Sequence, residues 1–172
     1  MSAGHVIRVA ALATLLALVW GAAPASAQKT QTQAFFEQRL LADGQTSKAI
    51  KTLLQSGGGF VDRNVVFRDL TGDKRDDAVV RVHSGGAAGV VALYVLSAHG
   101  TRRGRLRVVF HSQSLYRART KVTGAVLTVA QPDYARGDDL CCPSARIDRD
   151  YTWEEDRRRL LHRATRAIDL VG

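Results

Sequence analysis

The stretch from Val90 to Ser97 most constrains the fold, because its residues V-V-A-L-Y-V-L-S are almost continuously apolar. Successive side chains of a strand point to opposite faces, so a run that is apolar on both faces is expected at the centre of a sheet. Other β-branched or alternating runs lie on either side, separated by glycine and proline turn signals. We predict further strands over residues 65–70, 78–83, 106–112, 121–130, 146–153 and 160–167.

A helical pattern precedes the strands, over residues 34–56. Phe36 and Leu40 are four residues apart and begin an apolar stripe that continues through the segment. Asp43-Gly44 interrupts this stripe, and Ser47 is suited to cap a second segment. A helical piece followed by consecutive strands predicts an α+β fold, with an N-terminal helix (or two short helices) packed on a mostly antiparallel sheet of about six or seven strands.

Residues 1–27 have the pattern of a secretory signal peptide. His5 and Arg8 give a short positive region, residues 9–20 are apolar, and Ala25-Ser26-Ala27 is a small-x-small cleavage site. The alternative is an uncleaved membrane anchor, but a spanning helix needs about 20 apolar residues. We expect cleavage before Gln28 and a secreted, extracytoplasmic protein.

Residues 28–172 are long enough for one domain with its own core, and we predict a single α+β domain without a transmembrane segment. The formal net charge of the whole chain is +9 at pH 7. A basic exported protein is attracted to anionic envelope polymers, phospholipid head groups or extracellular nucleic acid. The alternative is that the charge only keeps the domain dispersed.

The string D-L-T-G-D-K-R-D-D-A-V-V, which begins at Asp69, resembles the calcium loop of FG-GAP/VCBS repeats. The resemblance implies a Ca²⁺ site made of oxygen ligands. Its ligands would be the side chains of Asp69, Thr71, Asp73 and Asp77 and the carbonyl of Arg75. The alternative, which we favour, is a hairpin turn whose Asp and Thr side chains accept hydrogen bonds from backbone N–H groups. We therefore expect no cofactor, with Ca²⁺ as the candidate exception.

Cys141 and Cys142 are the chain's only cysteines and are adjacent. In an exported protein they pair with each other, pair with another chain, or stay free. One interpretation is a redox-active site, in which Arg136 and Arg146 favour the thiolate if they lie close enough. The other is a rigid turn or two packed thiols, since the sequence shows no C-x-x-C motif.

Arginines gather in three short segments of the second half of the chain. Alternating side chains of a strand share a face, so we treat two of these segments as candidate anion-binding residues. The candidates are Arg103, Arg105, Arg107, Arg117, Arg119 and Lys121. If their strands are neighbours, the sheet presents one basic face; the alternative is a solvated outer face. The third segment, the arginines at 157–159, marks a turn. Nucleic acid is not expected, because aromatic residues are not interleaved with these arginines.

Several motifs together resemble the LppP/LprE type of actinobacterial envelope lipoproteins and their secreted relatives. They are D-L-T-G-D-K-R-D-D-A-V-V, H-S-G-G-A-A-G, D-D-L-C-C-P-S and the pair Tyr151-x-Trp153, within roughly residues 60–160. The resemblance implies an exported domain whose role is unassigned, so it carries over no catalytic residue.

The sequence thus favours a non-enzymatic envelope or extracellular module that binds an anionic cell-envelope polymer or another exported protein. The alternatives are a thiol-redox protein that uses Cys141 and Cys142, and a calcium-stabilised scaffold. The sequence names neither the ligand nor the oligomeric state.

Overall fold

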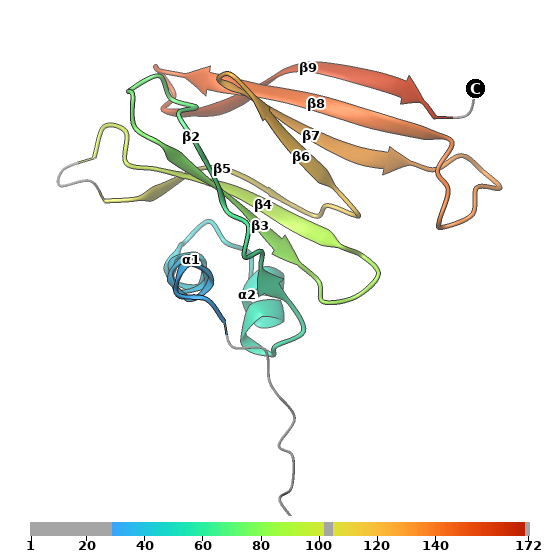
Figure 1. The fold of residues 1–172 in the computed structure, drawn as a ribbon, viewed down its shortest axis with the longest axis horizontal. Coiled ribbons are helices and arrows are strands. Elements are labelled where there is room, and N and C mark those ends of the chain that lie inside the picture. Colours follow the sequence, from blue (N-terminus) through green and yellow to red (C-terminus); the bar gives the residue numbers. More distant parts are fainter. Residues whose placement is uncertain (1–28, 102–104, 171–172) are drawn as a thin grey trace, which may run out of the picture.

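The computed structural model describes residues 29–101 and 105–170. Within them the chain forms two helices and nine strands, which are arranged as three layers: helices, a first sheet and a second sheet (Figure 1). The helices are α1 (Gln31–Ala42) and α2 (Lys48–Gln55). The strands are β1 (Phe60–Val61), β2 (Val66–Arg68), β3 (Asp77–His83), β4 (Val90–Ser97), β5 (Arg107–Gln113), β6 (Arg119–Thr123), β7 (Val126–Asp133), β8 (Ala145–Glu154) and β9 (Arg159–Asp169).

All of the described strand pairs are antiparallel. The first sheet has the order β1-β3-β4-β5, and β2 pairs with the other half of β3. The second sheet is the meander β6-β7-β8-β9. Strand β4 therefore has hydrogen-bonded neighbours on both sides, which confirms the predicted central strand.

The apolar residues of β4 face two cores because the first sheet is covered on both sides. Tyr94 and Leu96 join a cluster with the helices, while Leu93 and Val95 join a cluster with the second sheet. Each of these four side chains is at most 2% exposed. An alternating pattern would have sufficed for a sheet with one solvated face, so the continuous run reflects the middle layer.

The helices pack on the outer face of the first sheet through a narrow apolar stripe. Phe36 and Leu40 of α1 and Ile50 and Leu54 of α2 are buried against β1, β3, β4 and β5. Ser47 is the N-cap of α2, and its hydroxyl accepts a hydrogen bond from the N–H of Ile50. The predicted pair of short helices is confirmed.

The α+β class is confirmed, with nine strands in two sheets where about six or seven in one sheet were expected. The strand predicted over residues 121–130 is divided between β6 and β7, because Gly124 takes a φ of +56° that reverses the chain. Strand β1 was not predicted, since two residues give no periodicity to detect.

The predicted signal peptide lies outside the described residues. Within residues 29–101 and 105–170, no helix is long and apolar enough to cross a membrane.

Candidate functional site

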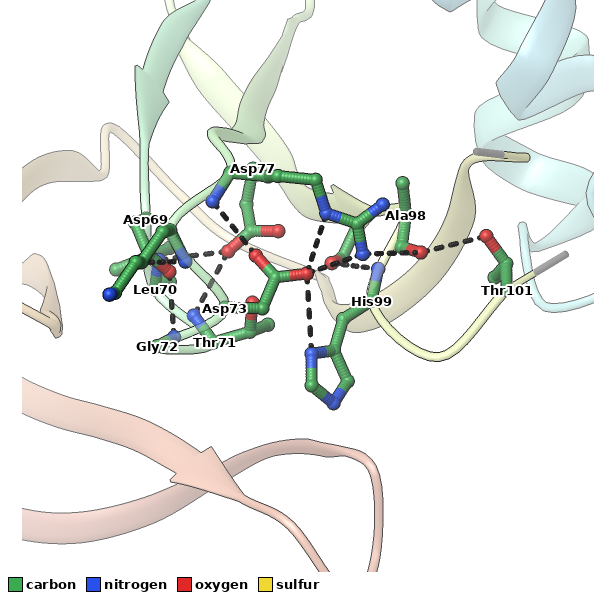
Figure 2. Close-up of polar contacts among 12 residues, drawn as sticks. Asp69, Leu70, Thr71, Gly72, Asp73, Asp77, Ala98, His99 and Thr101 are labelled. Carbon is green, nitrogen blue, oxygen red and sulfur yellow. Dashed lines mark hydrogen bonds and ion pairs between the residues drawn. The ribbon is translucent and has the colours of Figure 1, made fainter. Parts of the chain in front are cut away.

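The acidic turn connects β2 to β3 and is closed by its own carboxylates (Figure 2). Asp69 accepts two backbone hydrogen bonds, at 2.6 Å from the N–H of Gly72 and 2.9 Å from the N–H of Lys74. Gly72 and Lys74 have positive φ values of 78° and 66°. A positive φ is unfavourable for Lys74, which is not a glycine. The two hydrogen bonds to the Asp69 carboxylate therefore stabilise the turn in this conformation.

Asp77 closes the same turn from inside the protein. It is 1% exposed, and its Oδ2 accepts hydrogen bonds from the N–H groups of Leu70 at 2.8 Å and Thr71 at 3.0 Å. Burial raises the pKa of Asp77, while hydrogen bonds from Ser97 and from these two N–H groups oppose the rise. Asp77 is thus a buried acceptor for the backbone of the turn.

Asp73 contacts His99 (Figure 2), and His99 in turn contacts Glu155, which follows the last residue of β8. The Asp73 carboxylate binds Arg75 at 2.6 Å and lies 3.4 Å from His99 Nδ1. His99 Nε2 lies 3.1 Å from Glu155, which also accepts a hydrogen bond from the Trp153 indole at 2.6 Å. Burial raises the pKa of Asp73, but hydrogen bonds and charge from Arg75, and the charge of His99, outweigh it and leave that pKa lowered.

This geometry matches the hairpin interpretation of the acidic turn. Asp69 and Asp77 accept backbone N–H groups, and Asp73 is paired with Arg75. Among residues 29–101 and 105–170, no group of three or more His, Cys, Asp or Glu side chains is placed to hold a metal ion. The hydroxyl of Thr71 is buried and lacks a hydrogen-bond partner among these residues. Calcium binding stays a prediction, for which the stability test below is decisive.

Cys141 and Cys142 form a disulfide with each other, in the turn between β7 and β8. Both residues are exposed. The base of the turn is closed by Asp138, whose Oδ2 accepts the N–H groups of Ala135 and Ser144, both at 2.8 Å. These hydrogen bonds lower the pKa of Asp138. The disulfide therefore sits at the tip of a hydrogen-bonded turn.

A cavity of about 300 Å³ lies beside this turn, and we name it the turn cavity. It brings Cys141 and Arg146 together with Arg117 and Arg119, which lie more than 20 residues earlier in the sequence. Of the two arginines that could favour a thiolate if they lay close enough, Arg146 lines this cavity with Cys141, whereas Arg136 does not. The cavity is lined by Arg117, Arg119, Ala130, Pro132, Tyr134, Cys141, Pro143, Arg146 and Leu170.

A second hollow of about 440 Å³, which we name the arginine groove, lies between β5 and the start of β9. It joins Arg107 to the β8–β9 turn, and no Asp or Glu is among its described lining residues. Arg107 Nη2 is buried and has no hydrogen-bond partner in the described part of the chain. The groove is lined by Gln45, Arg107, Val108, Val109, Phe110, His111, Arg157, Arg158, Arg159, Leu160 and Leu161.

The condition for a single basic face is not met, because β5 and β6 belong to different sheets and are not neighbours. Arg107 lines the arginine groove, and Arg117 and Arg119 line the turn cavity. Arg105 and Lys121 are exposed and line neither hollow, and Arg103 lies outside the described residues.

Sequence reasoning missed the arginines at 157–159 as site residues. The sequence shows three consecutive arginines in a predicted turn, but only the tertiary structure places them around the same groove as Arg107.

Comparison of the chain with protein-family models, with curated proteins and with solved structures gave no significant match. The resemblance to the LppP/LprE type stays a prediction.

Proposed function

We propose that the chain is an exported, non-enzymatic module that binds an anionic polymer of the cell envelope through the arginine groove. The observation that carries the proposal is the set of four arginines around one groove whose described lining contains no carboxylate. Among the described residues, none of these four guanidinium groups forms an ion pair with Asp or Glu. Arg158 attracts the nearby Glu155 carboxylate without pairing with it, and the remaining positive charge is left for an external anion.

Guanidinium groups suit this role because they present several N–H donors in a plane that matches carboxylate and phosphate groups. The arginines at 157–159 are exposed, in the β8–β9 turn and at the start of β9. Arg107, the first residue of β5, has a buried Nη2 that finds no hydrogen-bond partner among the described residues. A buried donor without an acceptor is unfavourable, so we expect the Arg107 side chain to turn toward an anion bound in the groove.

The floor of the groove is held in place by a network around Gln113. Its Oε1 accepts hydrogen bonds from the N–H of Ser47 at 2.6 Å and from the hydroxyl of Tyr94 at 2.9 Å. Its Nε2 donates to the carbonyl of Gln45 at 2.8 Å and lies 3.0 Å from His111 Nδ1. Gln45 and His111 both line the groove, so its helix side is fixed before any ligand binds.

Export is supported by the pattern of residues 1–27 and by the disulfide, which is typical of proteins folded in oxidising compartments. The intact mass of the protein secreted from a producing cell tests this part directly. A chain that begins at Gln28 supports export, and a chain that retains residues 1–27 in the cytoplasm opposes it.

Binding of polyphosphate and of polygalacturonate, measured by isothermal titration calorimetry, tests the groove. The double variant Arg157→Gln plus Arg159→Gln should weaken binding about tenfold, because two partly exposed ion pairs with the polymer are lost. The matched control, Arg63→Gln plus Arg136→Gln, removes the same charge outside the groove and should change the dissociation constant less than about twofold. Equal losses of affinity in the two double variants would mean that the polymer binds by non-specific charge attraction and not at the groove.

A second candidate function, thiol–disulfide exchange, is favoured by the exposure of Cys141 and by the three arginines beside it. Nearby guanidinium groups lower the pKa of a thiol and favour the thiolate. Equilibration with glutathione redox buffers, followed by alkylation and mass measurement, tests this candidate. A redox role requires that the disulfide be reduced within the range of such buffers, and resistance to them indicates a structural bond.

A further inference from the structure

The turn cavity has a different composition from the arginine groove and lies at the other end of β8. The groove adjoins the β8–β9 turn, whereas the cavity adjoins the β7–β8 turn. Ten residues of extended strand separate the two turns, which corresponds to roughly 30 Å. The two hollows are therefore separate sites, and substitutions in one are expected to act independently of the other.

The cavity carries a net positive charge because only one of its three guanidinium groups is neutralised. Arg146 is paired with Asp148 at 2.8 Å. Arg117 donates to two neutral acceptors, the Tyr134 hydroxyl and the Leu140 carbonyl. Arg119 forms no ion pair with any carboxylate among the described residues. Two of the three charges remain for a ligand.

The cavity is also preorganised by hydrogen bonds from three directions. Tyr134 donates its hydroxyl to the Leu140 carbonyl at 3.0 Å, so Arg117 and Tyr134 share this acceptor. The backbone N–H of Arg117 is bound to the carbonyl of Ala88 at 2.8 Å, and the N–H of Leu170 to the carbonyl of Ser144 at 2.8 Å. These contacts fix the walls, so little ordering is required when a ligand binds.

Apolar groups complete the lining. Pro132, Pro143 and the disulfide at Cys141 offer surfaces that neither donate strong hydrogen bonds nor carry charge. Leu170, which also lines the cavity, is 47% exposed, and Leu140, next to Cys141 in the β7–β8 turn, is 74% exposed. A purely inorganic anion would leave this apolar surface in water, whereas a ligand with an organic body would cover it.

From this combination we infer that the turn cavity is a binding site for a small organic anion. A phosphate or carboxylate group of the ligand binds Arg117 and Arg119, and its ring or aliphatic body packs against Pro143 and the disulfide.

Calorimetric titration with four small probes tests the site: phenyl phosphate, benzoate, inorganic phosphate and benzyl alcohol. Phenyl phosphate should bind about tenfold more tightly than inorganic phosphate, as expected if roughly 55 Å² of apolar ligand surface is buried. Benzyl alcohol, which has the ring but no charge, should not bind measurably. Benzoate shows which oxyanion is preferred, and its binding at this site supports the inference as much as that of phenyl phosphate.

Arg119→Gln should weaken the binding of phenyl phosphate about tenfold, because one charge-assisted hydrogen-bond pair is lost. Lys121→Gln is the matched control, since it removes one exposed charge from the same strand without touching the cavity. Its affinity should stay within about twofold of the wild type. Circular dichroism confirms that both variants are folded.

Three results would overturn the inference: equal affinities for phenyl phosphate and inorganic phosphate, no loss in Arg119→Gln, or an equal loss in Lys121→Gln. The double variant Arg157→Gln plus Arg159→Gln should bind phenyl phosphate normally. A loss there equal to that of Arg119→Gln would mean that the probe follows the overall charge of the protein rather than this cavity.

Discussion

Removal of the Asp77 carboxylate is predicted to be among the most damaging single changes in the acidic turn. In Asp77→Ala the buried N–H groups of Leu70 and Thr71 lose their only acceptor in the described structure. Each unsatisfied buried donor costs about 1–3 kcal/mol, and relief of the desolvated carboxylate offsets part of the sum. We expect a loss of about 2–4 kcal/mol in the free energy of unfolding, measured by urea denaturation followed by circular dichroism.

Asp77→Asn isolates the hydrogen bonds from the charge. Its amide oxygen can accept both N–H groups, so at pH 7 the expected loss is below about 1.5 kcal/mol. Burial raises the pKa of Asp77, so the native state binds its proton more tightly than the unfolded chain does. Stability of the wild type should therefore fall as the pH rises from about 4, the usual Asp value, through the raised pKa. The Asn variant lacks this loss of stability. The difference in free energy of unfolding by which the wild type exceeds the Asn variant should therefore become smaller between pH 4 and pH 7.

Asp76→Ala is the control for both variants, because Asp76 lies next to Asp77 in the same turn but is exposed. Its free energy of unfolding should change by less than about 0.5 kcal/mol. If Asp77→Ala costs no more than Asp76→Ala, or if Asp77→Asn costs as much as Asp77→Ala, the account of the turn is refuted.

Three further predictions concern the stability of the chain. Gln113→Ala should cost about 1–3 kcal/mol in urea denaturation, because the buried hydroxyl of Tyr94 and the N–H of Ser47 lose their acceptor; an unchanged midpoint would contradict this. The pKa of Asp150 is lowered to about 2, first by the hydrogen bonds that its carboxylate accepts from Arg166. Its stabilising contribution is therefore present above about pH 4 and is lost as the pH falls toward 2. In Asp150→Asn the free energy of unfolding should fall less steeply below about pH 4 than it does in the wild type. The same pH dependence in both proteins would count against the ion pair between Asp150 and Arg166. If the acidic turn binds Ca²⁺, millimolar Ca²⁺ should raise the melting temperature of the wild type, and Asp73→Ala should abolish this rise. If the melting temperature of the wild type does not rise, the turn is closed by hydrogen bonds alone.

The two helices and the central strand of the fold follow closely from local patterns. The apolar run of β4, the cap at Ser47 and the interruption at Asp43-Gly44 are all local signals, and each matches the structure. The division of the strands into two sheets was not predictable in this way. Each of the two sheets has an apolar inner face, and strand periodicity does not say which strands share a sheet.

The candidate sites were predictable only in part. The residue types were visible in the sequence, but a shared face of Arg107 and Arg119 required neighbouring strands, and the two residues lie in different sheets. The grouping of Arg119 with Arg146 and Cys141 depends on the pairing of β6, β7 and β8, and that of Arg107 with the β8–β9 turn depends on how the two sheets pack. Such groupings join residues that are far apart in sequence, so spacing cannot reveal them.

The most direct test of the central claim is a nuclear magnetic resonance titration of the isotopically labelled protein with polyphosphate. Chemical-shift changes of backbone and arginine side-chain N–H groups should be concentrated at Arg107 and at the arginines 157–159. These changes should weaken as salt is added. Changes of similar size over all exposed arginines, or changes centred elsewhere on the molecule, would contradict the arginine groove as the binding site.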